Sequence, residues 1–423
     1  MKKTTFGLSL ALVLVCGAGA FAQDEDPVSD NKWHSLFGST HKKIAKEAIN
    51  RINKGAYPDI EAAKDELRSG AASESGHADF WRDNGGNPKA LWGNGDKKNQ
   101  GGVLGNYKAL NPEAAYHALG VICHLTQDMT VPAHAANIKH LSSEALEEYA
   151  DFAGKIGQVP EIASSKLPYE YYQIAQDETR SRLSSWLNPD TGRQFWLPSP
   201  LAPKLGQDTT FGPRGDYGGG KDTYAFWQGG SNNGHGAASN RIMITRFPEI
   251  CSERLGTAAG YTKAVMESAS RLLPPLVKDL EVYPNVVTPG GKVKISFTAL
   301  DNRTRDIRCS VRVTGPGGQE VYRVEGMAAL EKIKPAPFNS SNNDSSAVVE
   351  LFPESFMLNR RLSVELDGRK LTEGKYTVEV QLTDEDGNTI PADVNADSVR
   401  ENNSRTGLSV VNVIPESPSS PAW

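Results

Sequence analysis

The chain has 423 residues, with 46 Lys and Arg against 51 Asp and Glu, so its formal net charge is -5. This length suffices for two or three packed domains, and a mean hydropathy of -0.47 excludes a polytopic membrane protein. The slightly acidic balance argues against a nucleic-acid-binding protein that relies on a broad basic surface.

The first 22 residues have the pattern of a secretory signal peptide. Two lysines precede an apolar run at residues 6–15, and Ala20-Phe21-Ala22 is a typical cleavage site. The apolar run is too short to span a bilayer comfortably. We therefore expect a secreted protein, extracellular or periplasmic, whose signal peptide ends at Ala22.

Residues 33–275 are predicted to be mainly helical. Apolar residues recur at three- and four-residue spacing over residues 43–52 and 112–129. Pro132 marks the end of the second helix, because proline cannot continue it.

Two further helices are predicted at residues 144–155 and 253–273. Between them, residues 188–240 form a long irregular stretch that is rich in Gly, Pro and aromatic residues. Long loops inside compact domains are often functional. Two interpretations stay open: a loop held by its own aromatic side chains, or a wall of a lipid-facing cleft.

From about residue 279 to residue 415 the apolar spacing changes to two, as in Val293, Ile295 and Phe297. Turn signals such as Gly315-Pro316-Gly317 separate these runs, which predicts antiparallel strands. The expected fold class is therefore an all-α N-terminal domain followed by an all-β, immunoglobulin-like sandwich as C-terminal domain.

Three cysteines follow the predicted signal peptide, too few for a disulfide scaffold. A bridge between Cys123 and Cys251 is compatible with an exported protein, and the sequence leaves it open. Cys309 alternates with apolar strand residues, so we expect it to be buried as a small apolar side chain.

Candidate metal ligands gather in the first third of the chain. His124 and Asp128 are four residues apart on a predicted helix, so both side chains can reach one cation. His134 follows just past the helix end and His140 six residues later. Imidazole nitrogens together with a carboxylate suit zinc better than calcium or magnesium.

The surrounding segment, AAYHALGVICHLTQDMTVPAHAAN at residues 114–137, resembles the signature of bacterial zinc-dependent phospholipases C. That family includes the phosphatidylcholine-preferring and alpha-toxin types, and its fold is shared with single-strand-specific zinc nucleases. The resemblance covers residues 33–275 and implies a helical enzyme domain that holds up to three zinc ions.

For the first zinc ion the resemblance implies the N-terminal amine and carbonyl of Trp33, together with His41 and a bridging Asp128. Trp33 must then become the N-terminus, because an amide nitrogen is a poor zinc ligand. Residues 23–32 would be a short propeptide, removed by a trypsin-like cut after Lys32.

For the second zinc ion the resemblance implies His124 and Asp128 with Glu74 and His77 from the loop before them. The family usually has an Asp at a wider spacing from its His, so Asp79 is the alternative to Glu74.

The third zinc ion would take His134, His140 and Glu147, with Glu144 as the alternative glutamate. His117, seven residues before the first histidine of the motif, is expected to make a structural hydrogen bond.

The activity implied is hydrolysis of the glycerol-side phosphodiester of phosphatidylcholine-like lipids, giving diacylglycerol and a phosphorylated head group. Zinc-activated water would attack, and no protein nucleophile is needed. The catalytic residues would be Glu74, or else Asp79, as general base and Asp128 as bridging ligand. The partner would be phospholipid at a membrane surface, with no stable nucleic-acid partner, and we expect a monomer.

Two other functions stay open. A single-strand-specific zinc nuclease would need stacking aromatic side chains and local positive charge. A binding module with a degenerate metal centre would leave the β domain to carry the function.

Overall fold

The computed structural model describes residues 35–73, 87–95, 100–136, 146, 150, 154–187, 192, 194, 196, 247–303, 306–329, 348–350, 358–367, 371–384 and 407–413. The predicted signal peptide and propeptide lie outside these ranges, as does the loop predicted at residues 188–240 except for residues 192, 194 and 196. Of the helix predicted at residues 144–155, only residues 146, 150, 154 and 155 are described.

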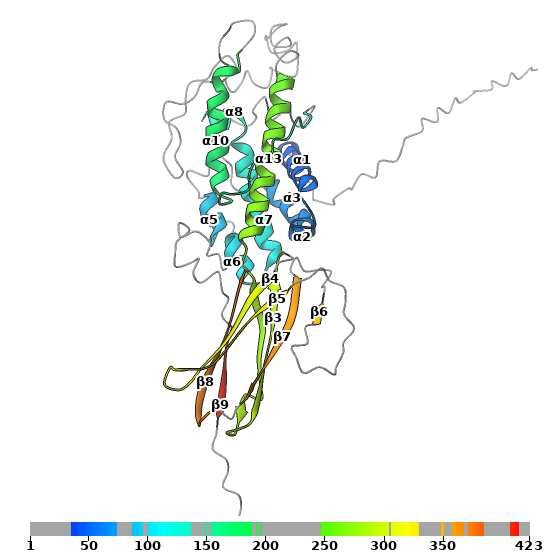
Figure 1. Ribbon diagram of the computed structural model, residues 1–423. Coiled ribbons are helices and arrows are strands. Elements are labelled where there is room, and N and C mark those ends of the chain that lie inside the picture. The colour runs from blue at the N-terminus through cyan, green and yellow to red at the C-terminus, as the bar shows by residue number, and fades with distance from the viewer. Residues whose placement is uncertain are drawn as a thin grey trace, which may run out of the picture. The chain divides into compact units, whose positions relative to one another are not determined.

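Helices precede strands along the chain (Figure 1). The α-helices are α1 (Ser35–Arg51), α2 (Pro58–Ala62), α3 (Lys64–Ala71), α5 (Pro88–Trp92), α6 (Gly102–Lys108), α7 (Pro112–Asp128), α8 (Pro132–Ala135), α10 (Glu170–Arg182) and α13 (Phe247–Leu272). A 3-10 turn, η2 (Leu183–Ser185), continues α10. The helices predicted at residues 43–52, 112–129 and 253–273 are confirmed by α1, α7 and α13, each of which ends one residue before the predicted end.

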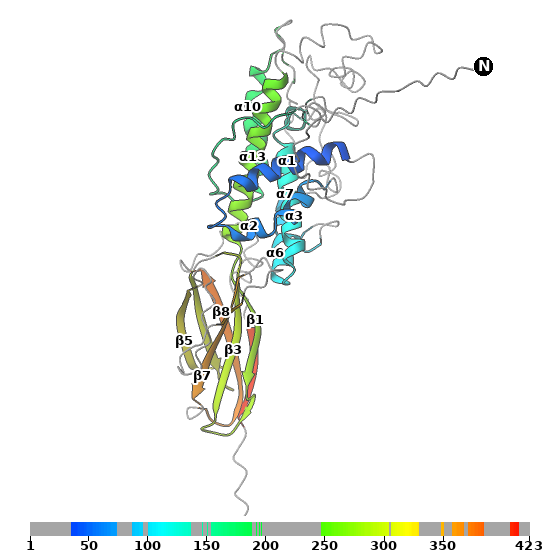
Figure 2. The same cartoon turned by 90° about the vertical axis from the view of Figure 1, so that its right-hand side faces the viewer.

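Helix α7 is the central helix of the helical part of the chain. The Asn111 side chain caps it by accepting a hydrogen bond from Ala114 N, and Pro112 occupies its first turn. From Ala118 to Asp128 every residue is buried, as expected for a helix surrounded by others. It packs against α6, which directly precedes it, and against α1, α3 and α13, which come from distant parts of the sequence (Figure 2).

The strands form two sheets. The strands are β1 (Leu276–Tyr283), β2 (Val286–Val287), β3 (Lys292–Asp301), β4 (Asp306–Thr314), β5 (Glu320–Ala329), β6 (Val348–Glu350), β7 (Leu358–Asp367), β8 (Gly374–Asp384) and β9 (Gly407–Val413). One sheet has the order β1-β3-β7-β6 and the other β2-β9-β8-β4-β5. Neighbouring strands are antiparallel except β2 and β9, which are parallel.

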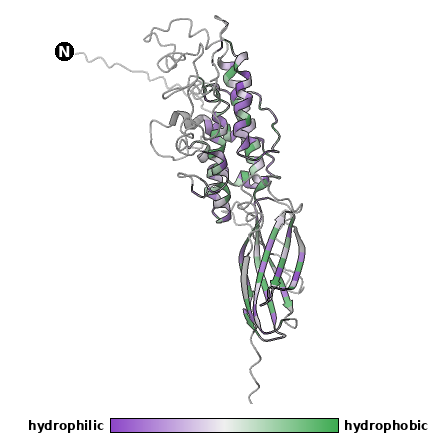
Figure 3. Cartoon of the chain, turned by 90° about the vertical axis from the view of Figure 1, so that its left-hand side faces the viewer, coloured by the Kyte–Doolittle hydropathy of each residue, from purple (hydrophilic) through white to green (hydrophobic). Residues whose placement is uncertain are grey.

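The two-residue periodicity has the expected effect on burial. Val293, Ile295 and Phe297 on β3 share an apolar core with Val378 and Val380 on β8. Hydrophobic and hydrophilic bands alternate along the strands in Figure 3. The predicted turn at Gly315 joins β4 to β5 and is closed by a hydrogen bond from Gly315 N to Gln319 O, 2.9 Å.

The expected fold class, an all-α domain followed by a separate all-β immunoglobulin-like sandwich, is wrong. His34–Trp423 form one compact unit in which α and β structure are combined. The physical reason is that packing continues across the expected boundary: Leu276 and Leu300, both on strands, belong to the apolar core of the helices.

Polar contacts cross the same boundary. The buried carboxylate of Asp59 on α2 accepts hydrogen bonds from Tyr116 Oη (2.5 Å), Ser270 Oγ (2.7 Å) and Asn302 Nδ2 (3.0 Å). Asn302, which follows β3, also donates to the main-chain oxygen of Ser270 on α13 (2.7 Å). Burial raises the pKa of Asp59, and these three donors lower it by less. Helices and strands are therefore joined by a hydrogen-bonded buried acid.

The cysteines form no disulfide in the described structure. Cys123 on α7 and Cys251 on α13 are both buried thiols. Cys309 on β4 is half-buried, and its burial raises the pKa of the thiol to about 12. Ile307 and Val311, two residues to either side of it on β4, lie in the apolar core, so Cys309 packs at the margin of that core.

Candidate metal centre

His41, His124 and Asp128 lie together in the helical part of the chain. His41 is on α1, and the other two are one turn apart on α7. His41 Nε2 lies 3.4 Å from Asp128 Oδ1, and His124 Nε2 lies 3.4 Å from Asp128 Oδ2. The ligand-type atoms of all three lie within 4.8 Å of one another, so the group could hold a metal ion.

This group is buried: the exposed fractions are 8% for His41, 4% for His124 and 3% for Asp128. A buried carboxylate is costly unless hydrogen bonds or a cation compensate its charge. The two 3.4 Å separations are longer than the roughly 2.7–2.9 Å of a charge-assisted hydrogen bond. The distances therefore fit ligands placed around a cation better than ion pairs between protonated histidines and Asp128.

The protonation of His124 follows from its other ring nitrogen. Nδ1 lies 2.8 Å from the main-chain oxygen of Ala71, the last residue of α3. A carbonyl oxygen only accepts, so Nδ1 carries the proton, and in the neutral ring Nε2 keeps its lone pair. That lone pair is on the side of Asp128, as a metal-ligating histidine requires.

A close helix crossing brings Ala71 to this position. An added Cβ on Gly120 of α7 would lie 2.4 Å from Leu67 O, and one on Gly70 of α3 would lie 2.0 Å from His117 O. Only glycine at both positions lets α3 and α7 approach this closely. The two glycines thus set the distance between the Ala71 carbonyl and His124.

His41 is held differently. Its Nδ1 lies 2.7 Å from Gln127 Oε1, and Gln127 Nε2 donates to Thr262 Oγ1 on α13 at 3.0 Å. Gln127 is 1% exposed and Thr262 is fully buried. One side-chain amide therefore connects α1, α7 and α13 beside the metal group.

A cavity adjoins the metal group on the side of His41. Among the described residues its lining is mainly apolar: Ile44, Val131, Leu146, Ala150, Cys251, Leu255 and Ala258, with Thr40, His41, Gln127, Thr130 and Arg254 as the polar members. No Phe, Tyr or Trp occurs in this described lining.

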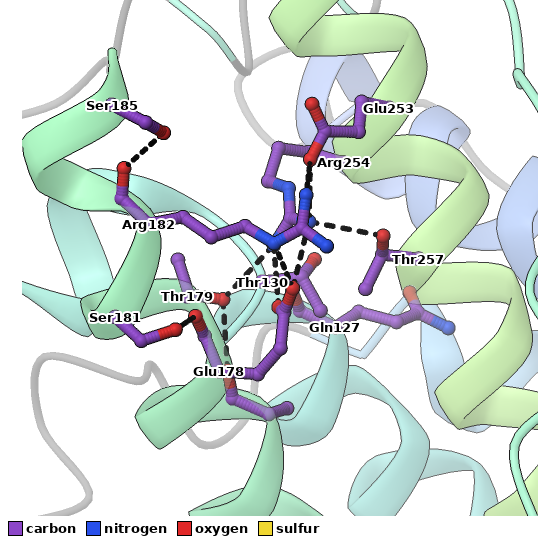
Figure 4. Close-up of polar contacts among 11 residues, drawn as sticks. Gln127, Thr130, Glu178, Thr179, Ser181, Arg182, Ser185, Glu253, Arg254 and Thr257 are labelled. Carbon is purple, nitrogen blue, oxygen red and sulfur yellow. Dashed lines mark hydrogen bonds and ion pairs between the residues drawn. The ribbon is translucent and has the colours of Figure 1, made fainter.

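Arg254 is the cationic member of the lining, and carboxylates compensate its charge. It is 2% exposed, and its guanidinium donates to Glu178 (2.7 and 3.2 Å), Glu253 (3.0 Å) and Thr257 (3.1 Å). Figure 4 shows these contacts, of which those to Glu178 join α10 to α13. The ring of Trp186 lies 5.2 Å from the guanidinium carbon. Arg254 therefore holds α10 and α13 together at the cavity wall.

The structure brings together three of the predicted site residues and places one more apart from them. His134 is on α8 and half-buried, and it is outside the group of described ligands formed around Asp128. His117 is on α7, where burial lowers its pKa. The other candidates lie outside the described residues: Trp33, Glu74, His77, Asp79, His140, Glu144 and Glu147.

Sequence reasoning missed Gln127, Thr262 and Arg254. Gln127 had a local signal, because it is a polar residue directly before Asp128, on a helix that is mostly apolar from Ala118 onward. Thr262 and Arg254 had none, since the partners that connect them to other helices, Gln127 and Glu178, lie 135 and 76 residues away along the chain.

No helix within the described ranges combines the length and apolar character needed to cross a membrane.

The chain shows little similarity to known proteins. No family model matches the chain, and no curated protein matches it. Among solved structures, the chain is similar to the Pseudomonas fluorescens alkylpurine DNA glycosylase AlkC bound to DNA containing an abasic site analog. The identity is 12%, with 91% of this chain and 99% of that chain covered, and the TM-score is 0.18. A score this low carries no inference about fold or function.

Proposed function

We propose that the protein is a zinc-dependent phosphodiesterase of the phospholipase C type, acting on phosphatidylcholine-like lipids. The observation that carries the proposal is the buried His41–His124–Asp128 group beside a mainly apolar cavity. The motif at residues 114–137, which resembles that of the zinc-dependent phospholipases C, contributes two of these three ligands.

Zinc is the metal that the donor set favours. Two imidazole nitrogens with a carboxylate are a usual zinc environment. Tetrahedral zinc ligands at about 2.0–2.2 Å from the ion are about 3.3–3.5 Å from one another, and the two histidines lie 3.4 Å from Asp128. Because each histidine faces a different oxygen of Asp128, Asp128 would be the ligand that both histidines share when zinc is bound.

When bound, zinc supplies a water of lowered pKa and positive charge for the phosphate oxygens. Asp128 holds its two oxygens towards the two histidines, and His124 presents an Nε2 atom without a proton. We assign the general base to Glu74, with Asp79 as the alternative. We assign further ligand roles to Trp33, His77, His134, His140 and Glu147.

The described cavity lining favours a lipid over a single-stranded nucleic acid. A nucleic-acid channel would combine aromatic side chains for stacking with uncompensated positive charge. This lining has apolar aliphatic side chains, and its cation, Arg254, is already bonded to Glu178 and Glu253. We further propose export by the N-terminal signal peptide and action as a monomer at a membrane surface.

The test is to purify the full chain with zinc, count bound zinc per chain, and assay phosphatidylcholine vesicles and single-stranded DNA side by side. We expect bound zinc and release of phosphocholine with diacylglycerol. His124→Ala should abolish release. His117→Ala, on the same helix but outside the metal group, is the matched control and should retain it.

Three results would contradict the proposal. DNA cleavage without lipid hydrolysis would make the protein a nuclease. Absence of bound zinc and of both activities would favour a binding module. Equal loss of activity in the His117 and His124 variants would remove the specific role of the metal group.

A further inference from the structure

We propose that Gln127 is a positioning residue for the metal centre: it fixes the tautomer and ring orientation of His41 and is itself fixed by Thr262. The inference rests on the metal-binding part of the proposed function and not on the lipid substrate. Three hydrogen bonds, followed from α13 to α1, carry it.

The first bond fixes the hydroxyl of Thr262. Its Oγ1 lies 2.7 Å from the main-chain oxygen of Ala258, one turn earlier on α13. Because a carbonyl oxygen only accepts, the Thr262 hydroxyl proton points to Ala258. The oxygen of Thr262 is then an acceptor for its second partner, Gln127.

The second and third bonds follow from the first. With the Thr262 oxygen accepting, the amide of Gln127 presents its NH2 group to Thr262 at 3.0 Å. Its Oε1 therefore faces His41 Nδ1 at 2.7 Å, and Nδ1 must carry the proton. In the neutral ring, Nε2 of His41 is left with its lone pair on the side of Asp128, 3.4 Å away.

The two histidines therefore reach the same protonation by different means. His124 is oriented by a main-chain carbonyl, which a substitution of the Ala71 side chain itself does not remove. His41 depends on one side-chain amide that is 1% exposed. A change at Gln127 should alter one ligand of the pair and leave the other in place.

The experiment compares four variants of the full chain. Gln127→Met keeps the side-chain length and removes both hydrogen bonds, and Thr262→Val removes the hydroxyl that orients the amide. Gln127→Glu keeps an acceptor for His41 Nδ1. Gln176→Met is the matched control, since Gln176 is also 1% exposed but lies on α10, outside the metal group.

The readouts are zinc affinity, by competition with a chromogenic chelator, and the melting temperature of the metal-free protein. Removing such an outer partner of a metal ligand typically lowers metal affinity by about 10–100-fold. We expect a loss of that size in Gln127→Met and a smaller one in Thr262→Val. Gln127→Glu should keep affinity within a few-fold of the unmodified chain, and Gln176→Met should leave it unchanged.

Nitrogen NMR of the metal-free protein gives a second readout that packing alone would not move. We expect His41 to be protonated at Nδ1 in the unmodified chain and to become a tautomer mixture in Gln127→Met. Unchanged zinc affinity in Gln127→Met, equal losses in Gln127→Met and Gln176→Met, or a chain that binds no zinc would each overturn the inference. Zinc binding that depends on Gln127, without lipid hydrolysis, would overturn only the phospholipase function.

Discussion

Gly120→Ala should push α3 and α7 apart and weaken the metal centre from a distance. The added Cβ would lie 2.4 Å from Leu67 O and 2.9 Å from Ala71 N, both main-chain atoms that cannot rotate away. Ordinary contacts begin at 3.4 Å, so the helices must separate locally by roughly 1 Å. A shift of that size along the hydrogen bond would lengthen the 2.8 Å contact between Ala71 O and His124 Nδ1 beyond hydrogen-bonding range.

Three terms determine the free energy of unfolding in this variant. Overpacking costs about 1–3 kcal/mol, and the lost hydrogen bond costs about 1 kcal/mol. Replacing glycine by alanine inside a helix returns about 1 kcal/mol. The net expectation is a destabilisation of about 1–3 kcal/mol. Zinc affinity should also fall by about 10–100-fold, because His124 loses the partner that orients it.

Urea unfolding and chelator competition measure the two effects. Gly105→Ala on α6 is the matched control, because the nearest atom to its added Cβ is 3.5 Å away. That control should be neutral or slightly stabilising and should bind zinc normally. If Gly120→Ala is as stable as the control, or loses stability while keeping full zinc affinity, the link between the helix crossing and His124 is refuted.

Other variants test the buried charges. Asp128→Asn should abolish the stabilisation by zinc, which for one site is about 2.7 kcal/mol when free zinc is at a hundred times its dissociation constant. If zinc raised the melting temperature of this variant as much as that of the unmodified chain, the prediction would be contradicted. The folded-state pKa of Asp59 is raised above 3.8 by burial. The contribution of Asp59 to the free energy of unfolding is therefore fully present below pH 3.8. It is lost as the pH rises through the raised pKa of the folded state. The stability of the unmodified chain relative to Asp59→Asn should then decline from acid to neutral pH in urea titrations; a constant difference would count against it. Arg254→Met should destabilise towards the lower end of about 3–5 kcal/mol, because Glu178 is partly exposed and keeps Arg182 as a partner. If the free energy of unfolding fell by less than about 1 kcal/mol, Arg254 would not be needed to hold α10 and α13 together.

Sequence periodicity was sufficient for the main elements of the fold. The spacing of apolar residues placed α7 and β3, and Pro132 marked the end of α7, although proline also opens α8 there. What the sequence did not reveal was that Leu276 and Leu300 pack into the helical core. Apolar strand residues look alike whichever core they enter, so the pattern suggested two separate domains.

The candidate site was predictable only in part. The i, i+4 spacing of His124 and Asp128 fixes their common face, and the structure places them 3.4 Å apart. The approach of His41 on α1 was implied by the family resemblance and not by spacing. Gln127 could not be linked to Thr262 beforehand, because their contact depends on how α7 packs against α13.

The buried carboxyl group of Asp59 affects how the protein unfolds. Its hydrogen-bond donors come from α7, α13 and the residue after β3, and Tyr116 is two helical turns before His124 on the same helix. Cutting the chain after residue 275 would remove Asn302 and leave one oxygen of the buried carboxylate with a donor fewer. Heating should therefore melt helices and strands in one cooperative transition, with the calorimetric enthalpy equal to the van't Hoff enthalpy. The β region would then serve the metal centre as its scaffold, even if it never touches a ligand.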